Sequence, residues 1–196
     1  MVLAGGASRR MGSDKRAMRL FPASPPFLER TVAVGRAVAD RVVVVGDSHP
    51  GVRAAFVTDR WPSGGPLGAL ITAFGLFPDD DLLVLAGDYP LLQVGLAVRL
   101  LEGLSGHDGS VAVDRGRRHP LVAAYDARRC ARMAGTLFGA GERSMAALVD
   151  QMRVRLVDVA VDDVADRHGL SLSNVNTPED VAALRTRCRK FDLEVR

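Results

Sequence analysis

The feature that most constrains this chain is the stretch of residues 3–15, where a short apolar run changes into glycines and then into cations. Its letters are Leu-Ala-Gly-Gly-Ala-Ser-Arg-Arg-Met-Gly-Ser-Asp-Lys. Gly5 and Gly6 carry no side chain, so backbone N–H groups are able to close on phosphate oxygens. Three cations follow the glycines: Arg9, Arg10 and Lys15. Their charge suits an anion with several negative units, so the stretch predicts a triphosphate-binding loop.

Two common phosphate-binding loops do not match this stretch. No Gly-Lys-Ser/Thr follows the glycines at the spacing of a Walker A loop, and the glycines do not form the dinucleotide pattern Gly-x-Gly-x-x-Gly. The loop therefore belongs to another class of nucleotide site.

Length and composition favour one globular domain. The chain has 196 residues, of which 47% are hydrophobic and 25% charged, with a net charge of +3. We expect a single domain over residues 1–196, with a nucleotide-binding half at about 1–105 and an acceptor half at about 106–196. The basic loop suits an anionic ligand. Nucleic acid is not expected, because aromatic residues make up only 5% and do not alternate with the cations.

The remaining bulk features predict a cytoplasmic protein that does not enter a membrane. No apolar run reaches the length of a membrane span, and the chain enters the glycine loop directly, which predicts no signal peptide. Met1-Val2-Leu3 is short for a central strand, so we expect a shortened first strand or a start upstream. Cys130 and Cys188 lie far apart and predict neither a zinc site nor a disulfide.

Strand-length apolar runs alternate with helix-length amphipathic stretches. We expect strands at 1–3, 41–46, 55–58, 81–86, 109–113, 121–125 and 154–159, and helices at 27–39, 65–77, 93–104, 127–134, 144–151 and 178–189. The run 41–46 is expected to be buried on both faces. Residues 114–120 are expected to form a polar turn. This order predicts an α/β fold: a three-layer αβα, Rossmann-like, mostly parallel sheet.

Four glycine or polar positions follow the first four expected strands: Gly5, Gly46, Asp59 and Asp88. In parallel sheets ligands bind beyond the carboxyl ends of the strands, so these positions predict one site. Asp88 is the sharpest candidate. It precedes Tyr89-Pro90, and a proline keeps the preceding residue out of a helix, so the chain turns away at the strand tip.

A lone carboxylate beside a phosphate loop suits Mg²⁺, which takes one or two carboxylates together with phosphate oxygens and water. Asp88 is therefore the predicted metal ligand, and the alternative is an ordinary turn aspartate. Lys15 and Arg10 are the predicted partners, because cations on a loop rim neutralise charge that develops on transferred phosphates.

The loop 3–15 resembles the N-terminal loop of the MobA family of molybdenum cofactor guanylyltransferases, whose pattern is Leu-Ala-Gly-Gly-x-Ser-x-Arg-Met-Gly-x-Asp-Lys. Residues 85–90 resemble that family's Cys-Asp-Met-Pro segment, whose aspartate binds Mg²⁺ and nucleotide, although this chain carries Tyr89 where methionine or threonine is usual. The resemblance implies a nucleotidyltransferase-type sheet. It extends from Leu3 to Val181, and the motifs follow one another in family order.

The resemblance also implies residues around the base. The segment 64–69 (Gly-Gly-Pro-Leu-Gly-Ala) resembles a family segment near guanine, although the family's Ala-Gly order is reversed at Gly68-Ala69. Proline at the first position of a helix explains part of this pattern without a ligand. An aspartate matching Asp59 lies close to the nucleotide in the family. The implied nucleotide-binding residues are Leu3, Ala4, Gly5, Gly6, Lys15, Asp59, Gly65, Pro66 and Asp88.

Three later motifs resemble family segments on the acceptor side. They are Gly116-Arg117-Arg118-His119-Pro120-Leu121, Gly141-Glu142-Arg143-Ser144-Met145 and Asn174-Val175-Asn176-Thr177-Pro178-Glu179. Arg117, Arg118 and Arg143 are candidates to hold the acceptor phosphate. An attacking phosphate monoester is largely ionised at pH 7 and needs no base, so His119 is interpreted as structural or positioning.

The last of these motifs has two parts. Thr177, Pro178 and Asp180 have the pattern of a capping box that starts a helix. That pattern leaves Asn174 and Asn176 unexplained. The resemblance implies that both asparagines face the acceptor together with Arg143.

The implied activity is transfer of GMP from GTP to molybdenum-molybdopterin with Mg²⁺, releasing pyrophosphate. GTP and molybdopterin are the expected partners, and transient contacts with proteins that deliver molybdopterin or mature molybdoenzymes are compatible with this activity. Two alternatives stay open: a CTP-dependent cytidylyltransferase and a non-catalytic nucleotide-binding regulator, whereas a nucleic-acid-binding protein is disfavoured. A sugar-1-phosphate nucleotidyltransferase is disfavoured, because that group usually has a longer chain and a Gly-x-Gly-Thr-Arg loop.

Overall fold

The computed structural model describes residues 1–4, 17–49 and 51–193. A seven-stranded sheet runs through it in the order β3-β2-β1-β4-β6-β5-β7. The strands are β1 (Val2–Leu3), β2 (Val43–Val45), β3 (Ala55–Val57), β4 (Asp81–Ala86), β5 (Gly109–Asp114), β6 (Arg117–Asp126) and β7 (Val154–Asp158). Only the pairs that include β6 are antiparallel. The mostly parallel sheet is as expected from the alternating pattern.

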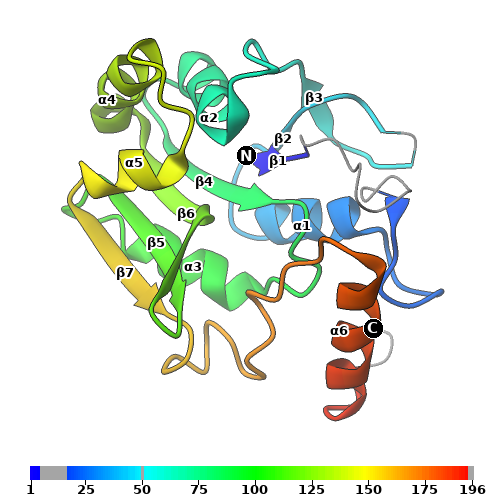
Figure 1. The fold of residues 1–196 in the computed structure, drawn as a ribbon. Helices are drawn as coiled ribbons and strands as arrows, with labels where there is room; N and C mark the ends of the chain where they lie inside the picture. The colour runs from blue at the N-terminus through cyan, green and yellow to red at the C-terminus, as the bar shows by residue number, and fades with distance from the viewer. Residues whose placement is uncertain (5–16, 50, 194–196) are drawn as a thin grey trace.

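Helices cover both faces of the sheet, which gives three layers (Figure 1). One layer holds α1 (Phe27–Arg36) and α3 (Val94–Glu102), and the other holds α2 (Gly65–Leu76), α4 (Ala127–Gly139) and α5 (Met145–Asp150). The last helix, α6 (Pro178–Arg189), packs through Val181, Leu184 and Cys188 against Leu20 and Phe27. The predicted three-layer αβα fold is confirmed.

Strand β4 shows how the sequence pattern creates two cores. Its side chains alternate: Leu82 and Val84 join the cluster under α2, α4 and α5, whereas Leu83 and Leu85 join the cluster under α1 and α3. Alternation of side chains along a strand requires this division. Because both faces are covered, every residue from Leu82 to Ala86 is apolar and buried. The strand has the predicted bounds.

The run 41–46 is less buried than predicted. Strand β2 includes only Val43–Val45, and the prediction of burial on both faces is wrong for Arg41, whose side chain is 66% exposed. Its guanidinium pairs with Asp80 at 2.6 Å and lies 4.9 Å from the centre of the Phe77 ring. A charged side chain at the start of a strand keeps its hydration by staying at the sheet margin, so full burial begins only at Val44, three residues later.

The expected polar turn at 114–120 is also corrected. The turn is the two-residue Arg115-Gly116, and both residues have positive φ, 48° and 79°. This combination closes a tight hairpin between paired Asp114 and Arg117, so β6 begins four residues earlier than predicted. The ladder is then interrupted around Pro120, which cannot donate a backbone hydrogen bond. The Tyr125 hydroxyl donates to the Pro120 carbonyl at 2.7 Å.

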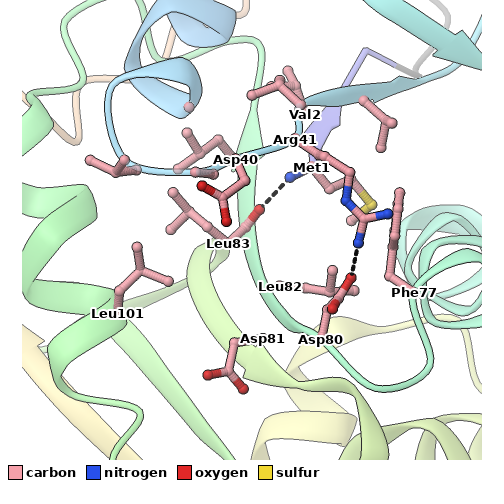
Figure 2. Close-up of a pocket in the computed structure, with 16 residues that line it drawn as sticks. Met1, Val2, Asp40, Arg41, Phe77, Asp80, Asp81, Leu82, Leu83 and Leu101 are labelled. Carbon is pink, nitrogen blue, oxygen red and sulfur yellow. Dashed lines mark hydrogen bonds and ion pairs between the residues drawn. The ribbon is translucent and has the colours of Figure 1, made fainter.

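A cavity of about 290 Å³ lies at the amino ends of the central strands. Figure 2 shows its lining, with the Met1 α-amino group bonded to the Leu83 carbonyl at 2.6 Å and Arg41 paired with Asp80. Burial lowers the pKa of the Met1 amine to about 6. Strand β1 starts opposite Leu85, so four residues of β4 extend past it toward this cavity.

Both cysteines are buried free thiols, and burial raises the pKa of Cys130 to about 12. Within residues 1–4, 17–49 and 51–193, none of the helices has both the length and the apolar character that crossing a membrane requires.

Candidate active site

The first four strands in chain order end at one edge of the sheet, here called the carboxyl edge. Ala4 N–H donates to the Val45 carbonyl at 3.1 Å, Gly46 N–H to the Val57 carbonyl at 2.9 Å, and Gly87 N–H to the Leu3 carbonyl at 3.0 Å. The chain therefore leaves β1 between Gly46 and Gly87. The predicted phosphate residues Gly5, Gly6, Arg10 and Lys15 lie outside the described residues, and the predicted residues Leu3 and Ala4 form the stem from which they leave.

The turn that carries Asp88 is fixed from several sides. The Asp88 carbonyl accepts a hydrogen bond from Val175 N–H at 2.9 Å. Two residues on, the Pro90 carbonyl accepts one from Arg30 Nε of α1 at 2.7 Å. These bonds tie the tip of β4 to α1 and to the segment before α6. A carboxylate on such a turn has a defined position beside the stem of the loop.

The segment 174–176 lies beside Asp88, because Val175 N–H bonds the Asp88 carbonyl, and it is part of the chain that leads into α6 in Figure 1. Val175 is buried, and Asn174 and Asn176 on either side of it are half-exposed. The capping box is confirmed: Asp180 N–H donates to Thr177 Oγ1 at 3.2 Å, and Asp180 Oδ2 accepts from Thr177 N–H at 2.9 Å. Asp180 Oδ2 also accepts from Asn176 N–H at 2.7 Å. The cap thus fixes the backbone that presents the two asparagines.

Asp59 follows β3 and is part of a local turn. Its Oδ1 accepts from Trp61 N–H at 2.8 Å and lies 3.1 Å from the Thr72 hydroxyl of α2. An aspartate that bonds the backbone two residues ahead is typical of an Asx turn. One carboxylate oxygen of Asp59 is therefore used to hold the β3–α2 connection, and its predicted contact with the base stays a prediction.

The glycines that begin α2 are closely packed against protein atoms. A Cβ at Gly64 would lie 2.8 Å from Phe138, and one at Gly68 would lie 2.9 Å from Trp61 Cβ. Gly65 has a φ of +62°, and a Cβ there would lie 3.2 Å from the Arg143 carbonyl. Packing against Trp61, Phe138 and Arg143 explains these glycines.

Arg143 is held at the α4–α5 connection. Its guanidinium lies 4.0 Å from the centre of the Phe138 ring and donates to the Phe138 and Glu142 carbonyls at 2.9 and 2.7 Å. The N–H groups of Ser144 and Arg143 bond the Glu142 carboxylate, which lowers the pKa of Glu142. Arg118, another predicted cation of the acceptor side, pairs with Asp150 at 2.6 Å.

A buried pair beside Asp88 could not be predicted from the sequence. The Tyr89 hydroxyl lies 3.0 Å from His119 Nδ1, and the two rings meet edge to face with their centres 5.8 Å apart. The sequence indicated a structural or positioning role for His119 but gave no partner for it. Only the pairing of β4 with β6 brings these residues together, and no local pattern encodes that pairing.

The described residues thus form two groups. One unites Leu3 and Ala4, Asp88, and the segment 174–176. The other unites Asp59, the start of α2 with Gly65 and Pro66, and Arg143. The printed contacts of Arg143 are with the second group rather than with the asparagines expected to act beside it. The described residues hold no cluster of three or more His, Cys, Asp or Glu side chains suited to a metal. A single carboxylate still suits Mg²⁺, because substrate phosphates and water supply its other ligands.

Comparison with known proteins agrees with this architecture. The model of the MobA-like NTP transferase domain matches residues 1–156. A probable molybdenum cofactor guanylyltransferase of Chloroflexus aggregans is 32% identical over 188 residues, which cover 92% of this chain and 90% of that protein. A protein with the same description from Mycobacterium tuberculosis is 36% identical over 159 residues, or 76% and 78% of the two chains.

Among solved structures, molybdopterin-guanine dinucleotide biosynthesis protein A from Archaeoglobus fulgidus has the same fold. Its TM-score is 0.79 at 23% identity, with 96% of this chain and 97% of that chain covered. The family model ends before the segment 174–176, whereas the alignment with the Chloroflexus protein spans most of the chain. Because the family model matches residues 1–156 and the identity to the Chloroflexus protein extends over most of the chain, the chain belongs to the MobA-like NTP transferase family.

Proposed function

We propose that this protein transfers GMP from GTP to molybdenum-molybdopterin, which gives the molybdopterin guanine dinucleotide cofactor and pyrophosphate. The relatives in Chloroflexus and Mycobacterium carry the guanylyltransferase description at 32% and 36% identity. The observation that carries the proposal is the meeting of the Asp88 turn with the stem at Leu3 and with the segment 174–176. Motifs from both ends of the chain thereby converge on one edge of the sheet.

The chemistry is a displacement at phosphorus. An oxygen of the acceptor's terminal phosphate forms a bond to the α-phosphorus of GTP. The bond from that phosphorus to the oxygen that bridges to the β-phosphate breaks, and pyrophosphate leaves. The acceptor is already an anion at pH 7, so the protein's contribution is positioning and charge stabilisation.

The residues divide into three roles in this proposal. The backbone N–H groups of Gly5 and Gly6 hold phosphate oxygens, and Arg10 and Lys15 neutralise the pyrophosphate. Asp59, Gly65 and Pro66 frame the base. Arg143, Asn174 and Asn176 face the acceptor.

Mg²⁺ is proposed as the metal, with Asp88 as its protein ligand. When bound, it supplies positive charge to the phosphates of GTP. Asp88, a residue of intermediate exposure on a turn held by Val175 and Arg30, suits this role. Transient contacts with proteins that deliver molybdopterin or mature molybdoenzymes stay predictions.

The test is product analysis with purified protein, molybdenum-molybdopterin, Mg²⁺ and either GTP or CTP. We expect the guanine dinucleotide and pyrophosphate in equal amounts from GTP. We expect at least tenfold less product from CTP. A preference for CTP would overturn the guanine assignment, and nucleotide binding without any product would favour the non-catalytic alternative.

A further inference from the structure

The pair of Tyr89 and His119 is a buried polar contact directly beside the proposed metal ligand. Tyr89 is 8% exposed and His119 is 6% exposed. Their hydroxyl and Nδ1 are 3.0 Å apart. The pair joins the turn after β4 to β6, and its two residues are 30 positions apart in the sequence. It therefore links the nucleotide half of the chain to the acceptor half.

Both members of the pair are uncharged at neutral pH. Burial raises the pKa of Tyr89 to about 12, and the negative charge of Asp88 acts in the same direction. Burial lowers the pKa of His119, the Arg117 cation lowers it further, and Asp114 opposes them. A neutral phenol and a neutral imidazole share one hydrogen bond, and the charged groups that act on them are Asp88, Arg117 and Asp114.

Burying the second ring nitrogen of His119, Nε2, lowers the stability of the folded protein. Among the described residues Nε2 has no hydrogen-bond partner, and it is buried. A buried polar atom without a partner costs about 1–3 kcal/mol. Tyr89 belongs to an apolar core cluster that also contains Leu92 and Val122. A residue that served packing alone would be better replaced by an apolar one, so the pair has another use.

The position of the pair beside the turn that carries Asp88 indicates this use. Asp88 is one residue before Tyr89, and the turn is already bonded at the Asp88 carbonyl by Val175 and at the Pro90 carbonyl by Arg30. Tyr89 lies between these two bonds, and its side chain is the anchor on the β6 side. With the hydroxyl bonded to His119, the Tyr89 side chain is tied to β6, and with it the backbone that adjoins Asp88.

We propose that Tyr89 and His119 are a positioning pair that orients the Asp88 carboxylate for nucleotidyl transfer. Neither side chain touches the reacting atoms. The pair acts by fixing the direction in which Asp88 meets the metal and the triphosphate, so the inference rests on the proposed function. Loss of the hydroxyl should slow the transfer step more than it weakens substrate binding.

The first test compares the two tyrosines of the chain. Tyr89→Phe should lower kcat by about 10- to 100-fold and change the KM for GTP by less than about threefold. Tyr125→Phe is the matched control, because the Tyr125 hydroxyl also makes one hydrogen bond, to the Pro120 carbonyl of the same hairpin. We expect it to lower stability and to leave kcat within about threefold. Equal losses of kcat in both variants, or a Tyr89→Phe variant with normal kcat, would overturn the proposal.

The second test uses rescue at position 119. His119→Leu removes the hydrogen-bond partner of the hydroxyl and should lower kcat as Tyr89→Phe does, whereas His119→Asn places an amide group near the position of Nδ1 and should recover at least a third of the activity. The double variant Tyr89→Phe with His119→Leu should be no slower than either single variant, because both remove the same bond. Losses that multiply, or no recovery with asparagine, would count against a shared positioning role.

A binding readout separates this inference from the proposed function. Mn²⁺ affinity in the presence of GTP, measured by electron paramagnetic resonance, should fall about 3- to 10-fold in Tyr89→Phe and stay unchanged in Tyr125→Phe. Wild-type protein that binds Mn²⁺ and GTP but forms no product would overturn the proposed function alone. Equal Mn²⁺ affinity in wild type and Tyr89→Phe would overturn the positioning pair whatever the activity.

Discussion

The two edges of the central sheet are built differently. At the carboxyl edge, backbone groups of Leu3, Gly87 and Asp88 are bonded to other segments, and polar side chains lie next to the turn. At the amino edge, apolar side chains surround a cavity of about 290 Å³, and an exposed ion pair joins Arg41 to Asp80 (Figure 2). The carboxyl edge, where the chemistry is proposed, is held by specific hydrogen bonds, whereas the amino edge contains a cavity. Substitutions at the first should change activity, and substitutions at the second should change stability.

The largest expected effect is at the carboxyl edge. Asp88→Asn should lower the rate of GMP transfer by at least about 1,000-fold, because the amide lacks the charge that holds the metal. The free energy of unfolding should change by less than about 1 kcal/mol, since the carbonyl that Val175 bonds is retained. Both expectations are checked by measuring the rate of GMP transfer and the unfolding in urea on the same preparation. A nearly normal rate would contradict the metal role.

The next effect tests the amino edge. Leu83 is 5% exposed and borders the cavity, so Leu83→Ala should lower the free energy of unfolding by about 2–4 kcal/mol. The transfer rate per folded molecule should stay within twofold. Leu101→Ala, at a half-buried position of the same lining, is the control and should cost less. A loss of rate without a loss of stability would show that the two edges are not separate.

A smaller effect of opposite sign is expected at Gly35. This glycine lies inside α1 and borders the cavity, and a Cβ there would meet Val42 at an ordinary 3.4 Å. Gly35→Ala should therefore raise the free energy of unfolding by about 0.5–1 kcal/mol. The matched change at the carboxyl edge, Gly64→Ala, should destabilise, because its Cβ would lie 2.8 Å from Phe138. Equal effects of the two changes on thermal unfolding would refute this contrast.

The smallest effect is a dependence of stability on pH. The pKa of His119 is lowered in the folded protein by burial and by Arg117, whereas an unfolded histidine titrates near 6.5. Between these two values the unfolded state binds more protons, so stability should fall as pH falls below about 6.5. The difference in urea midpoint between wild type and His119→Asn should shrink over this range. Leu83→Ala, which keeps His119, should follow wild type in parallel.

Local patterns predicted the elements whose own residues determine them. The apolar run of β4 and the capping box of α6 gave the observed bounds, because burial and capping act within a few residues. The start of β6 was wrong, since two positive-φ residues moved the turn to Arg115-Gly116 and allowed charged residues into the strand. Polar letters alone do not reveal where a tight turn closes.

The site was predicted less completely than the fold. The sequence placed Asp88 and Asn174–Asn176 at one site, and the structure brings them side by side. It gave no sign that Tyr89 would meet His119, or that the glycines before α2 would pack against Trp61 and Phe138. Those contacts depend on the register between distant segments, which hydrophobic periodicity does not record.

The position of β1 has a consequence for how the protein is made. This first strand is the one between β2 and β4, and the Met1 amine bonds Leu83, 82 residues further along the chain. At a synthesis rate of about 5–20 residues per second, several seconds pass before that partner has been translated. During this interval β1 lacks its β4 partner and the Asp88 turn has not been made, so a nascent chain has no formed pocket to offer a nucleotide. GTP should therefore protect the finished protein from proteolysis but leave ribosome-bound fragments shorter than about 86 residues unprotected.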